Sequence, residues 1–459
     1  MQGLAGATFP YRTAGGSDRL AGEPTEGQSP KGTVMNRAGW MALIVLTTWA
    51  SGARAAGEAT TIELTVKVPA DAGRHVPVCA TIELPKALAK TAPEAIGATL
   101  TPPGDAKAVP GQVVRDGDRV QLWWILPQAK AGVSRWTATL PARPYRGKDV
   151  FAFTEVPGKC LDLRFAGRLV TRHMIAFDTS TKAKAFETYK PYTHVFDAAG
   201  KDVITKDAHG HDPHHRGIYI GWGKTTCAGK RYNFWSMGSG QAQVHKEFLS
   251  RTAGPVLARW VARVDWQDAA GKAIVSERRE MTCFRQPASM IALIEFRSEL
   301  KAVASDVTLD ANPEHGGFQY RAHNDVAVQV GATGGKQTAD TAKADLKTRY
   351  AFHRDGIATG GQRLNDNKDL PWAAQSYALR GKRYCVQHMN HPSNPRPTVY
   401  SAYRPYGRFG AFFKTAIPAG KTLSLRYRLG IAESEMLPRS QMALRHAGFV
   451  TPPTAEATR

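Results

Sequence analysis

The sequence predicts an all-β protein, with a very large antiparallel β-sandwich preceded by a small β-sandwich domain. Apolar and polar residues alternate in short runs such as LDLRFAG at 161–167 and TLSLRYRLGI at 422–431, and this period of two is typical of half-buried antiparallel strands. Turn-forming stretches separate the runs, and the pentapeptide DAAGK, at 197–201 and 268–272, places a glycine where a hairpin closes. Long helical patterns are almost absent, apart from SEMLPRSQMALRHAGF near the C-terminus.

These patterns divide the chain into a small domain, a large domain and a short C-terminal part. The Pro/Arg/Gly-rich stretch PARPYRGKD reads as the linker between the two domains. We expect a small β-sandwich at 58–145, a large catalytic or binding β-sandwich at 155–435, and a C-terminal helix and tail at 436–459.

The region that begins at Met35 has the anatomy of a secretory signal peptide. Arg37 provides the positive charge, residues 40–49 an apolar core, and Ala53 to Ala55 an A-x-A cleavage site. We therefore expect a signal peptide at 35–55 and a secreted or periplasmic protein, with residues 1–34 being an over-long gene start or a disordered segment. No apolar run reaches the ~20 residues of a membrane-spanning helix, so we expect no transmembrane segment in the mature chain.

Charge and cysteine content exclude several functional classes. The 459-residue chain has a net charge of +22, but its Lys and Arg residues are spread evenly, so we expect no nucleic-acid partner. Attraction to acidic glycans or to an anionic surface would explain the positive net charge, and so would a need for solubility alone. The five cysteines stand far apart with no CxxC pair, which argues against zinc-ribbon and thioredoxin sites and leaves one or two disulfides open.

Four histidines fall within seven positions of the stretch DAHGHDPHHRGIYIGWGK at 207–224. Pro213 prevents a helix, so the histidines are expected on a loop that leads into the strand IYIGW. Imidazoles there could bind a divalent metal, act as acid or base, hydrogen-bond a sugar, or only satisfy backbone groups. The cofactor is therefore left open, with His211, His214 and His215 as the candidate metal ligands.

Two further segments combine histidine, arginine and aromatic residues: ANPEHGGFQYRAHND at 311–325 and QHMNHPSNPRPTVYSAYRPYGRFG at 387–410. Aromatic rings beside such polar groups are typical of carbohydrate clefts, although each segment could also be an ordinary surface loop. We expect all three segments to line one cleft. The predicted catalytic residues are His211, His214, His215, His315 and Glu314, and the predicted substrate-binding residues are Arg216, Trp222, Trp235, Gln319, Arg321, His391, Asn394 and Arg396.

In order along the chain, the pieces DPHHRGIYIGWG, NFW, GGFQYR, NHPSNPR and LRYRL resemble the bacterial secreted proteins of the "PmoA family", which are filed as methane oxygenases. The resemblance extends over residues 160–432 and leaves the first 150 residues outside it. It implies a galactose-mutarotase-like β-supersandwich. It also implies a family found among secreted carbohydrate-processing proteins, without an assigned reaction.

From these observations we expect a secreted carbohydrate-active protein with a carbohydrate or glycoside substrate. It would be a hydrolase, lyase or epimerase that acts on a sugar or modified glycoside through a His/Arg-rich cleft. The paired carboxylates of glycosidases are not evident, which favours proton abstraction or metal-assisted chemistry. The alternatives are a non-catalytic carbohydrate-binding protein and, following the family label, a copper or iron oxygenase.

Overall fold

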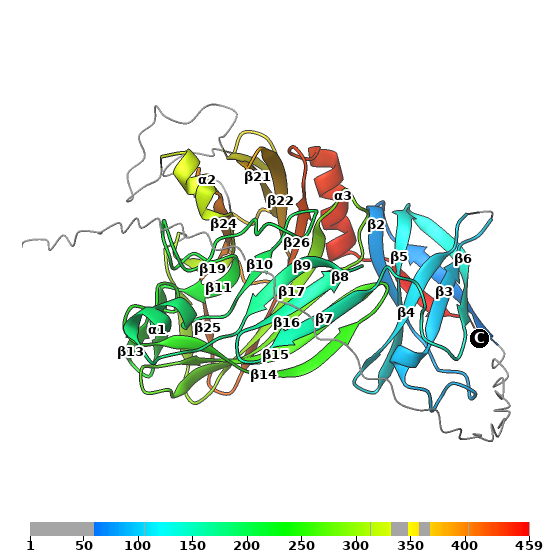
Figure 1. The fold of residues 1–459 in the computed structure, drawn as a ribbon, viewed down its shortest axis with the longest axis horizontal. Helices are drawn as coiled ribbons and strands as arrows, with labels where there is room; N and C mark the ends of the chain where they lie inside the picture. The colour runs from blue at the N-terminus through cyan, green and yellow to red at the C-terminus, as the bar shows by residue number, and fades with distance from the viewer. Residues whose placement is uncertain are drawn as a thin grey trace, which may run out of the picture. The chain divides into compact units, whose positions relative to one another are not determined.

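The computed structural model describes residues 59–458, apart from 105, 313, 332–347, 358–367 and 403. The described residues belong to one compact unit that starts at Ala55. Nearly all of their regular elements are strands (Figure 1), which confirms the predicted all-β class. The predicted signal peptide at 35–55 and the segment 1–34 lie outside the described residues.

The N-terminal domain is a closed barrel with the strand order β1-β27-β2-β5-β4-β3-β6. The sequence predicts a small two-sheet sandwich here, but β27 comes from the far C-terminus and fills the gap between β1 and β2, pairing antiparallel with β1 and parallel with β2. The strands are β1 (Thr60–Val68), β2 (Gly73–Thr81), β3 (Gly97–Thr101), β4 (Val109–Asp116), β5 (Arg119–Ala129), β6 (Gly132–Leu140) and β27 (Thr454–Ala457).

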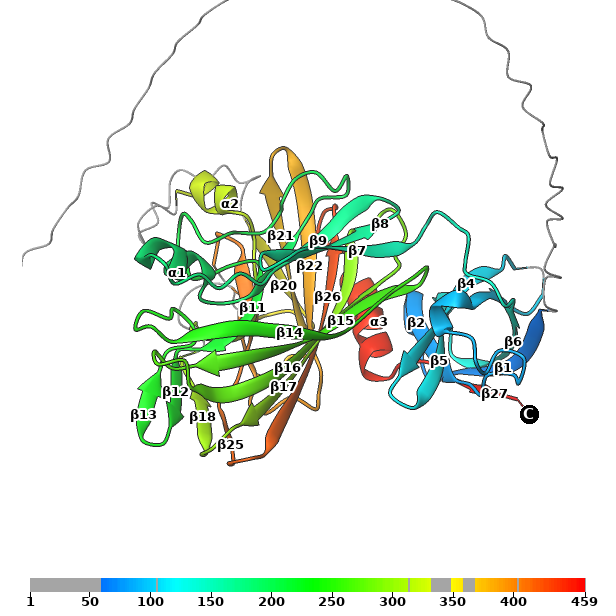
Figure 2. The same ribbon diagram turned by 60° about the horizontal axis from the view of Figure 1, so that its bottom comes forward.

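The large domain contains two eight-stranded sheets, called here the first and second sheets, and a smaller four-stranded sheet (Figure 2). The first sheet consists of β23 (Val399–Ser401), β24 (Arg408–Phe412), β19 (Gly316–Arg321), β11 (Ile218–Trp222), β10 (Tyr192–Val195), β9 (Arg168–Met174), β8 (Cys160–Phe165) and β7 (Phe151–Val156). The second sheet consists of β14 (Ala242–Ala253), β15 (Leu257–Gln267), β16 (Ala273–Phe284), β17 (Ala292–Ala302), β26 (Thr422–Ala432), β22 (Lys382–Asn390), β21 (Trp372–Leu379) and β20 (Arg349–Phe352). The four-stranded sheet consists of β13 (Lys230–Tyr232), β12 (Lys224–Cys227), β18 (Val307–Asp310) and β25 (Thr415–Ile417).

The core of the large domain lies between the two eight-stranded sheets. Phe318 of the first sheet stacks on two rings of the second, with ring centroids 4.3 Å from Phe296 and 4.7 Å from Tyr427. Trp222 lies 6.1 Å from Trp266, and all five rings belong to one continuous buried cluster. Aromatic pairs at these distances add to the stability gained from burying their apolar surface.

In the described part of the chain three α-helices accompany the sheets: α1 (Lys182–Thr188), α2 (Asn324–Gln329) and α3 (Arg439–Val450). The last of these confirms the helix predicted near the C-terminus, whereas the sequence predicts neither α1 nor α2. Among the described residues no helix is long and apolar enough to span a bilayer. All five cysteines are free thiols, so none of the possible disulfides is formed.

Gly317 gives a first test of the fold. Its φ of +85° lies in the left-handed region, and a Cβ added to it would lie 1.9 Å from the carbonyl oxygen of Ala411 on the paired strand. We expect Gly317→Ala to lower the free energy of unfolding by roughly 3 kcal/mol or more. The control Gly381→Ala has a similar φ of +74° but open space around it, and should cost about 1 kcal/mol. Equal losses for the two variants in denaturant titrations would contradict this packing.

His388 gives a second test, through the pH dependence of stability. It is buried between the sheets, where its Nδ1 lies 3.1 Å from the hydroxyl of Tyr400, and burial lowers the pKa of His388 from 6.5 to about 3. Between these values the unfolded chain binds a proton there that the folded chain does not, so stability falls as the pH falls from about 6.5. We expect His388→Gln to flatten the fall in Tm on acidification, and the exposed control His209→Gln to leave it unchanged. An identical slope for wild type and His388→Gln would contradict the assignment.

Candidate functional site

The candidate site lies on the outer face of the first sheet, opposite the core. In β11, β19 and β24 the core side chains alternate with a second set that points outward. Tyr219 pairs across strands with Gln319, and Arg321 pairs with Arg408, so these four side chains share the outer face. All four are at most 1% exposed, because loops cover this part of the sheet.

The loop at 207–217, called here the histidine loop, is held against α1 by Arg216. The Arg216 side chain is fully buried, and its guanidinium donates to the carbonyl oxygens of Pro213, Glu187 and Phe186. It also lies 4.0 Å from the centre of the Tyr189 ring. Arg216, predicted to bind substrate, thus has its donors directed at the protein's own backbone, where it fixes the position of the histidines.

Asp212 lies at the centre of the histidine loop. Its Oδ2 is 3.3 Å from Nε2 of His211 and 3.5 Å from Nδ1 of His215, and possible ligand atoms of Asp212, His214 and His215 all lie within 4.8 Å of one another. The structure therefore groups Asp212 with two of the three predicted metal ligands, while the ring of His211 packs 4.8 Å from that of Tyr406.

The imidazoles of His211, His214 and His215 are held neutral at pH 7, because burial lowers the pKa of each. Burial, with a further contribution from the charge of Lys190, lowers the pKa of His214 to about 3. Burial and the neighbouring His214 and Arg408 hold the pKa of His215 well below its usual value. A neutral imidazole can accept a proton, hydrogen-bond a hydroxyl group or ligate a metal.

Trp235 lies over this cluster and connects it to the rim. Its ring is 5.1 Å from that of Tyr219, 5.3 Å from that of His215 and 6.2 Å from that of His315. Lys190 donates from Nζ to the Trp235 carbonyl oxygen at 2.6 Å and lies 4.6 Å from the centre of the Tyr219 ring. The indole Nε1 of Trp235 and the hydroxyl of Tyr219 are buried without a hydrogen-bond partner.

Arg321 and Arg408 supply positive charge beneath the cluster. Nη1 of Arg321 donates to the carbonyl oxygens of Tyr406 and Ala322, while its Nε and Nη2 are buried without a partner. Arg408 donates from Nη1 to Gln319 and from Nη2 to Ser401, both at 3.0 Å. Burial lowers the pKa of Arg321 to about 10, so the guanidinium remains charged at pH 7.

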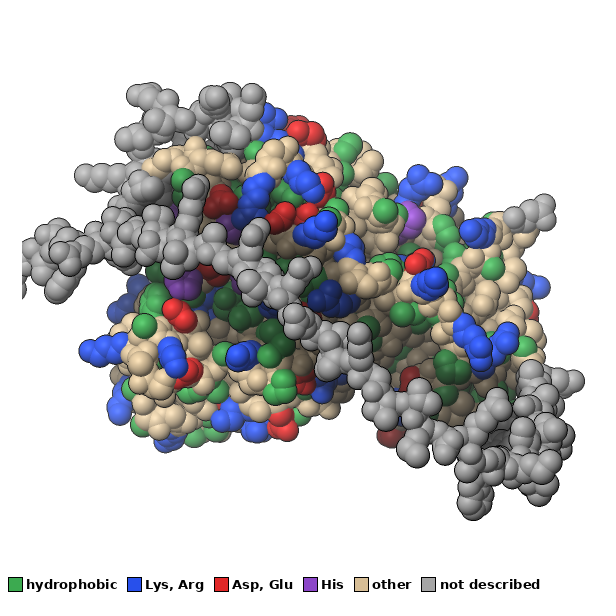
Figure 3. Space-filling view, viewed as in Figure 1, with side chains coloured by type: hydrophobic (Ala, Val, Ile, Leu, Met, Phe, Trp, Pro, Cys, Tyr) green, Lys and Arg blue, Asp and Glu red, His purple; other side chains and the backbone are tan. Residues whose placement is uncertain are grey.

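The predicted catalytic residues Glu314 and His315 lie at the rim of the site. Glu314 is half-buried and pairs with Nη2 of Arg404 at 2.6 Å. His315 is exposed, and its Nδ1 is hydrogen-bonded to the side-chain oxygen of Asn312. Burial of part of its ring and the charge of Arg408 lower the pKa of His315. In Figure 3 histidine side chains are visible in a recessed part of the surface.

The other predicted site residues lie elsewhere. Trp222 is in the core, and its indole Nε1 donates to the carbonyl oxygen of Phe413 at 2.9 Å. His391 and Asn394 contact Arg426 of β26, in the second sheet, and Arg396 is exposed on the same loop. All three predicted segments therefore reach the site, the third through Tyr406 and Arg408 in its C-terminal part. The contacts of its NHPSNPR loop place that loop against another part of the large domain.

The prediction from sequence did not include several residues that belong to the cluster: Asp212, Lys190, Tyr219, Tyr406 and Arg408. For Tyr219 a signal was present, because the alternation in IYIGW places it opposite Ile218 and Ile220. Arg408 carries the same signal, since it alternates with the buried Phe409 at the start of a strand. Lys190 has no such signal, because α1 and the turn after it bring it to the site.

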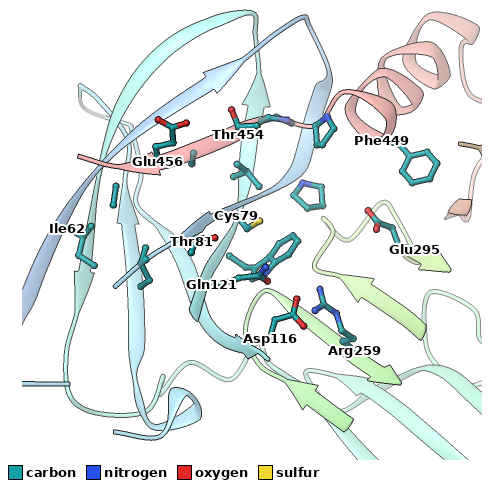
Figure 4. Close-up of a pocket in the computed structure, with 18 of the residues that line it drawn as sticks. Ile62, Cys79, Thr81, Asp116, Gln121, Arg259, Glu295, Phe449, Thr454 and Glu456 are labelled. Carbon is teal, nitrogen blue, oxygen red and sulfur yellow. The ribbon is translucent and has the colours of Figure 1, made fainter. Parts of the chain in front are cut away.

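A separate cavity of 1150 Å³ is lined by the barrel strands and the second sheet (Figure 4). Cys79 and Gln121 come from the barrel, and Arg259 and Glu295 from β15 and β17. Burial opposes ionisation of Glu295, but Arg428 and Arg297 outweigh it and lower the pKa of Glu295 to about 2. The buried carboxylates that line this cavity already pair with arginines that line it, Glu280 with Arg259 and Glu295 with Arg428. The cavity is therefore a less favourable candidate than the histidine cluster.

Arg216 gives a test of how the site is built. We expect Arg216→Met to release the histidine loop from α1, because the three backbone carbonyl groups lose a charged donor that methionine cannot replace. Stability should fall by about 2 kcal/mol or more, and limited proteolysis should cut within 207–217. The control Arg396→Met removes an exposed guanidinium and should change neither. Equal protease resistance of Arg216→Met and wild type would show that Arg216 does not hold the loop.

Comparison with known proteins gives a family but little beyond it. A search of the curated proteins finds no match. Among solved structures, OccK10 (OpdN) of Pseudomonas aeruginosa is 10% identical over 75% of this chain and 98% of that chain, with a TM-score of 0.13, which is too low to indicate a shared fold. One family model matches residues 160–445, which comprise the large domain from β8 onward and the first part of α3. On that match the chain belongs to the family described as a family of unknown function (DUF6807).

Proposed function

We propose that this chain is an exported carbohydrate-active enzyme that binds an acidic sugar and removes the proton next to its carboxylate, as a lyase or an epimerase. The observation that supports this most directly is the buried edge of Arg321 formed by Nε and Nη2, which has no partner. Of the three reaction types expected from the sequence, hydrolysis is the least favoured. It requires a free pair of carboxyl groups, whereas Glu314 is paired with Arg404.

The open edge of Arg321 suits a carboxylate. Its Nη1 is fixed by backbone carbonyl groups, which orients the remaining edge, and two parallel N–H groups match the two oxygens of a carboxylate. Among the described residues no carboxylate pairs with Arg321 or Arg408. Buried cations without a counter-ion are costly, and a carboxylate supplied by a ligand would remove that cost.

The surrounding groups suit proton transfer beside such a carboxylate. An imidazole, for which His315 at the rim is our candidate, takes the proton, and the C–H electron pair moves into the carboxylate as an enolate held by Arg321 and Arg408. In a lyase the C–O bond at the next carbon then breaks, forming C=C, and the leaving oxygen takes a proton. In an epimerase a proton returns to the opposite face of the carbon. The hydroxyl of Tyr219, which has no partner of its own, is our candidate proton donor in either case.

The charge of the whole chain and its expected export agree with an acidic glycan as the substrate. A net charge of +22 favours encounter with polyanions outside the cell. The two arginines supply the selectivity for acidic over neutral sugars, and each lies over an aromatic ring of the site, Arg321 over Tyr406 at 4.6 Å and Arg408 over Trp235 at 5.9 Å. Export and the sugar substrate are part of this proposal.

Arg321 gives the sharpest test of this function. We expect the full-length protein to act on one or more members of a panel of uronate-containing glycans and to leave the matching neutral glycans unchanged. Arg321→Lys keeps the charge but loses the bidentate edge, so kcat/KM should fall by roughly 10- to 100-fold. Ultraviolet absorbance detects the C=C bond of a lyase product, and exchange of the abstracted proton with deuterium detects an epimerase.

The control for this test is Arg396→Lys, on the loop that lies away from the site, which should retain full activity. Equal turnover of neutral and acidic glycans, or an unchanged kcat/KM for Arg321→Lys, would contradict the role of the carboxylate. Tight binding of acidic glycans by wild type with no turnover and no deuterium exchange would make the chain a binding protein and overturn the enzyme proposal.

A further inference from the structure

The contacts of the Asp212 carboxylate in the histidine loop are not explained by hydrogen bonding. Nδ1 of His215 lies 3.5 Å from Oδ2 of Asp212, and both ring nitrogens of His215 are buried without a hydrogen-bond partner. A buried polar atom without a partner destabilises the fold by about 1–3 kcal/mol. The residue is 4% exposed, so water does not compensate for both nitrogens.

These separations fit the spacing of ligands around a metal ion. Bonds of ~2.0–2.2 Å from a metal to histidine nitrogen and carboxylate oxygen place neighbouring ligand atoms about 3.0–3.5 Å apart. The 3.5 Å between His215 and Asp212 agrees with this value, and the whole set with His214 lies within 4.8 Å. Small side-chain rotations are therefore enough to complete a three-ligand site.

The backbone holds the three side chains together before any ligand arrives. Asp212 has a φ of +49°, an uncommon conformation for a residue other than glycine. The backbone amide of His215 donates to the carbonyl oxygen of Asp212 at 2.9 Å. The amide of His211 donates to Asn324 at 2.8 Å, and Arg216 fixes the end of the loop. Such external supports are what a preorganised site requires.

We propose that Asp212, His214 and His215 bind one divalent first-row transition-metal ion, with its remaining coordination positions facing the site. Two imidazoles and one carboxylate suit zinc, cobalt, manganese or iron better than calcium or magnesium, which prefer oxygen ligands. Nε2 of His211 lies 3.3 Å from Oδ2 of Asp212, so His211 would orient this carboxylate without binding the metal itself.

The positive charge around the cluster shapes how such a metal binds. Arg321 and Arg408 are buried nearby and repel a cation, while Asp212 supplies the one carboxylate of the set. A carboxylate from the ligand offsets both the arginines and the metal. We therefore expect the metal to bind more tightly when an acidic sugar is present, by linkage between the two ligands.

The test is titration of the full-length, chelator-treated protein with Co²⁺, followed by its visible absorption spectrum and by calorimetry, without any substrate. We expect one equivalent to bind with a spectrum unlike that of aqueous Co²⁺. Asp212→Asn, a partly exposed and nearly isosteric change, and His214→Ala should each weaken binding by about 100-fold or more. The control is His209→Ala, a histidine of the same loop that lies outside the set, and it should bind Co²⁺ as wild type does.

Two results would overturn the metal site: a wild-type spectrum identical to that of aqueous Co²⁺, or equal weakening by His209→Ala and Asp212→Asn. Because Asp212→Asn leaves the volume of the side chain nearly unchanged, misfolding of His214→Ala does not leave the question open. The site stands independently of the proposed reaction. Metal binding with no turnover on the acidic glycans would overturn the reaction and leave the metal site in place. Turnover on the acidic glycans by a protein that binds no Co²⁺ would overturn the metal site and leave the reaction in place.

Discussion

The candidate site depends on the alternation of side chains along β11, β19 and β24. One set of side chains builds the core, and the set between them supplies Tyr219, Gln319, Arg321 and Arg408 to the outer face. The covering loop can then approach the sheet because Gly221 has no side chain: a Cβ there would lie 2.1 Å from the carbonyl oxygen of Phe234. Trp235, the next residue, is thereby placed directly over the outward-facing side chains. A rigid core and a polar site are thus two faces of the same three strands.

The buried basic side chains are the main unfavourable feature of this arrangement. Lys190, Lys206, Arg216, Arg321 and Arg408 are at most 1% exposed. Burial, with the charge of Arg321, lowers the pKa of Lys206 to about 7, which shows how strongly the environment disfavours charge. The buried guanidinium of Arg216 is hydrogen-bonded to backbone carbonyl groups, whereas that of Arg321 keeps one edge without a partner. Such sites are retained at some loss of stability when they serve binding or catalysis.

Sequence patterns predicted the strands well, because alternation and turn residues are local properties. The two DAAGK turns illustrate this: Gly200 and Gly271 have φ values of +69° and +81°, as a left-handed closing glycine requires. The position of the NHPSNPR loop could not be predicted in the same way. The prolines of this segment indicate a loop. Its position in the large domain, however, depends on the pairing of the preceding strand β22 with β26, which is a long-range contact. Trp222 was predicted as a sugar contact from its residue type, although alternation with Tyr219 already placed it on the core side.

Strand β27 makes completion of the barrel depend on a segment that lies far along the chain from the other barrel strands. The six strands of residues 60–140 leave the ribosome before the large domain, yet β1 and β2 become neighbours of β27 only when residues 454–457 arrive. Until then both strands present unpaired backbone groups along one edge, the kind of edge that recruits strands from other chains. The barrel would therefore close only after the strands of the large domain have been made. Its open edge would need protection, by a chaperone or by rapid folding, until residues 454–457 are available.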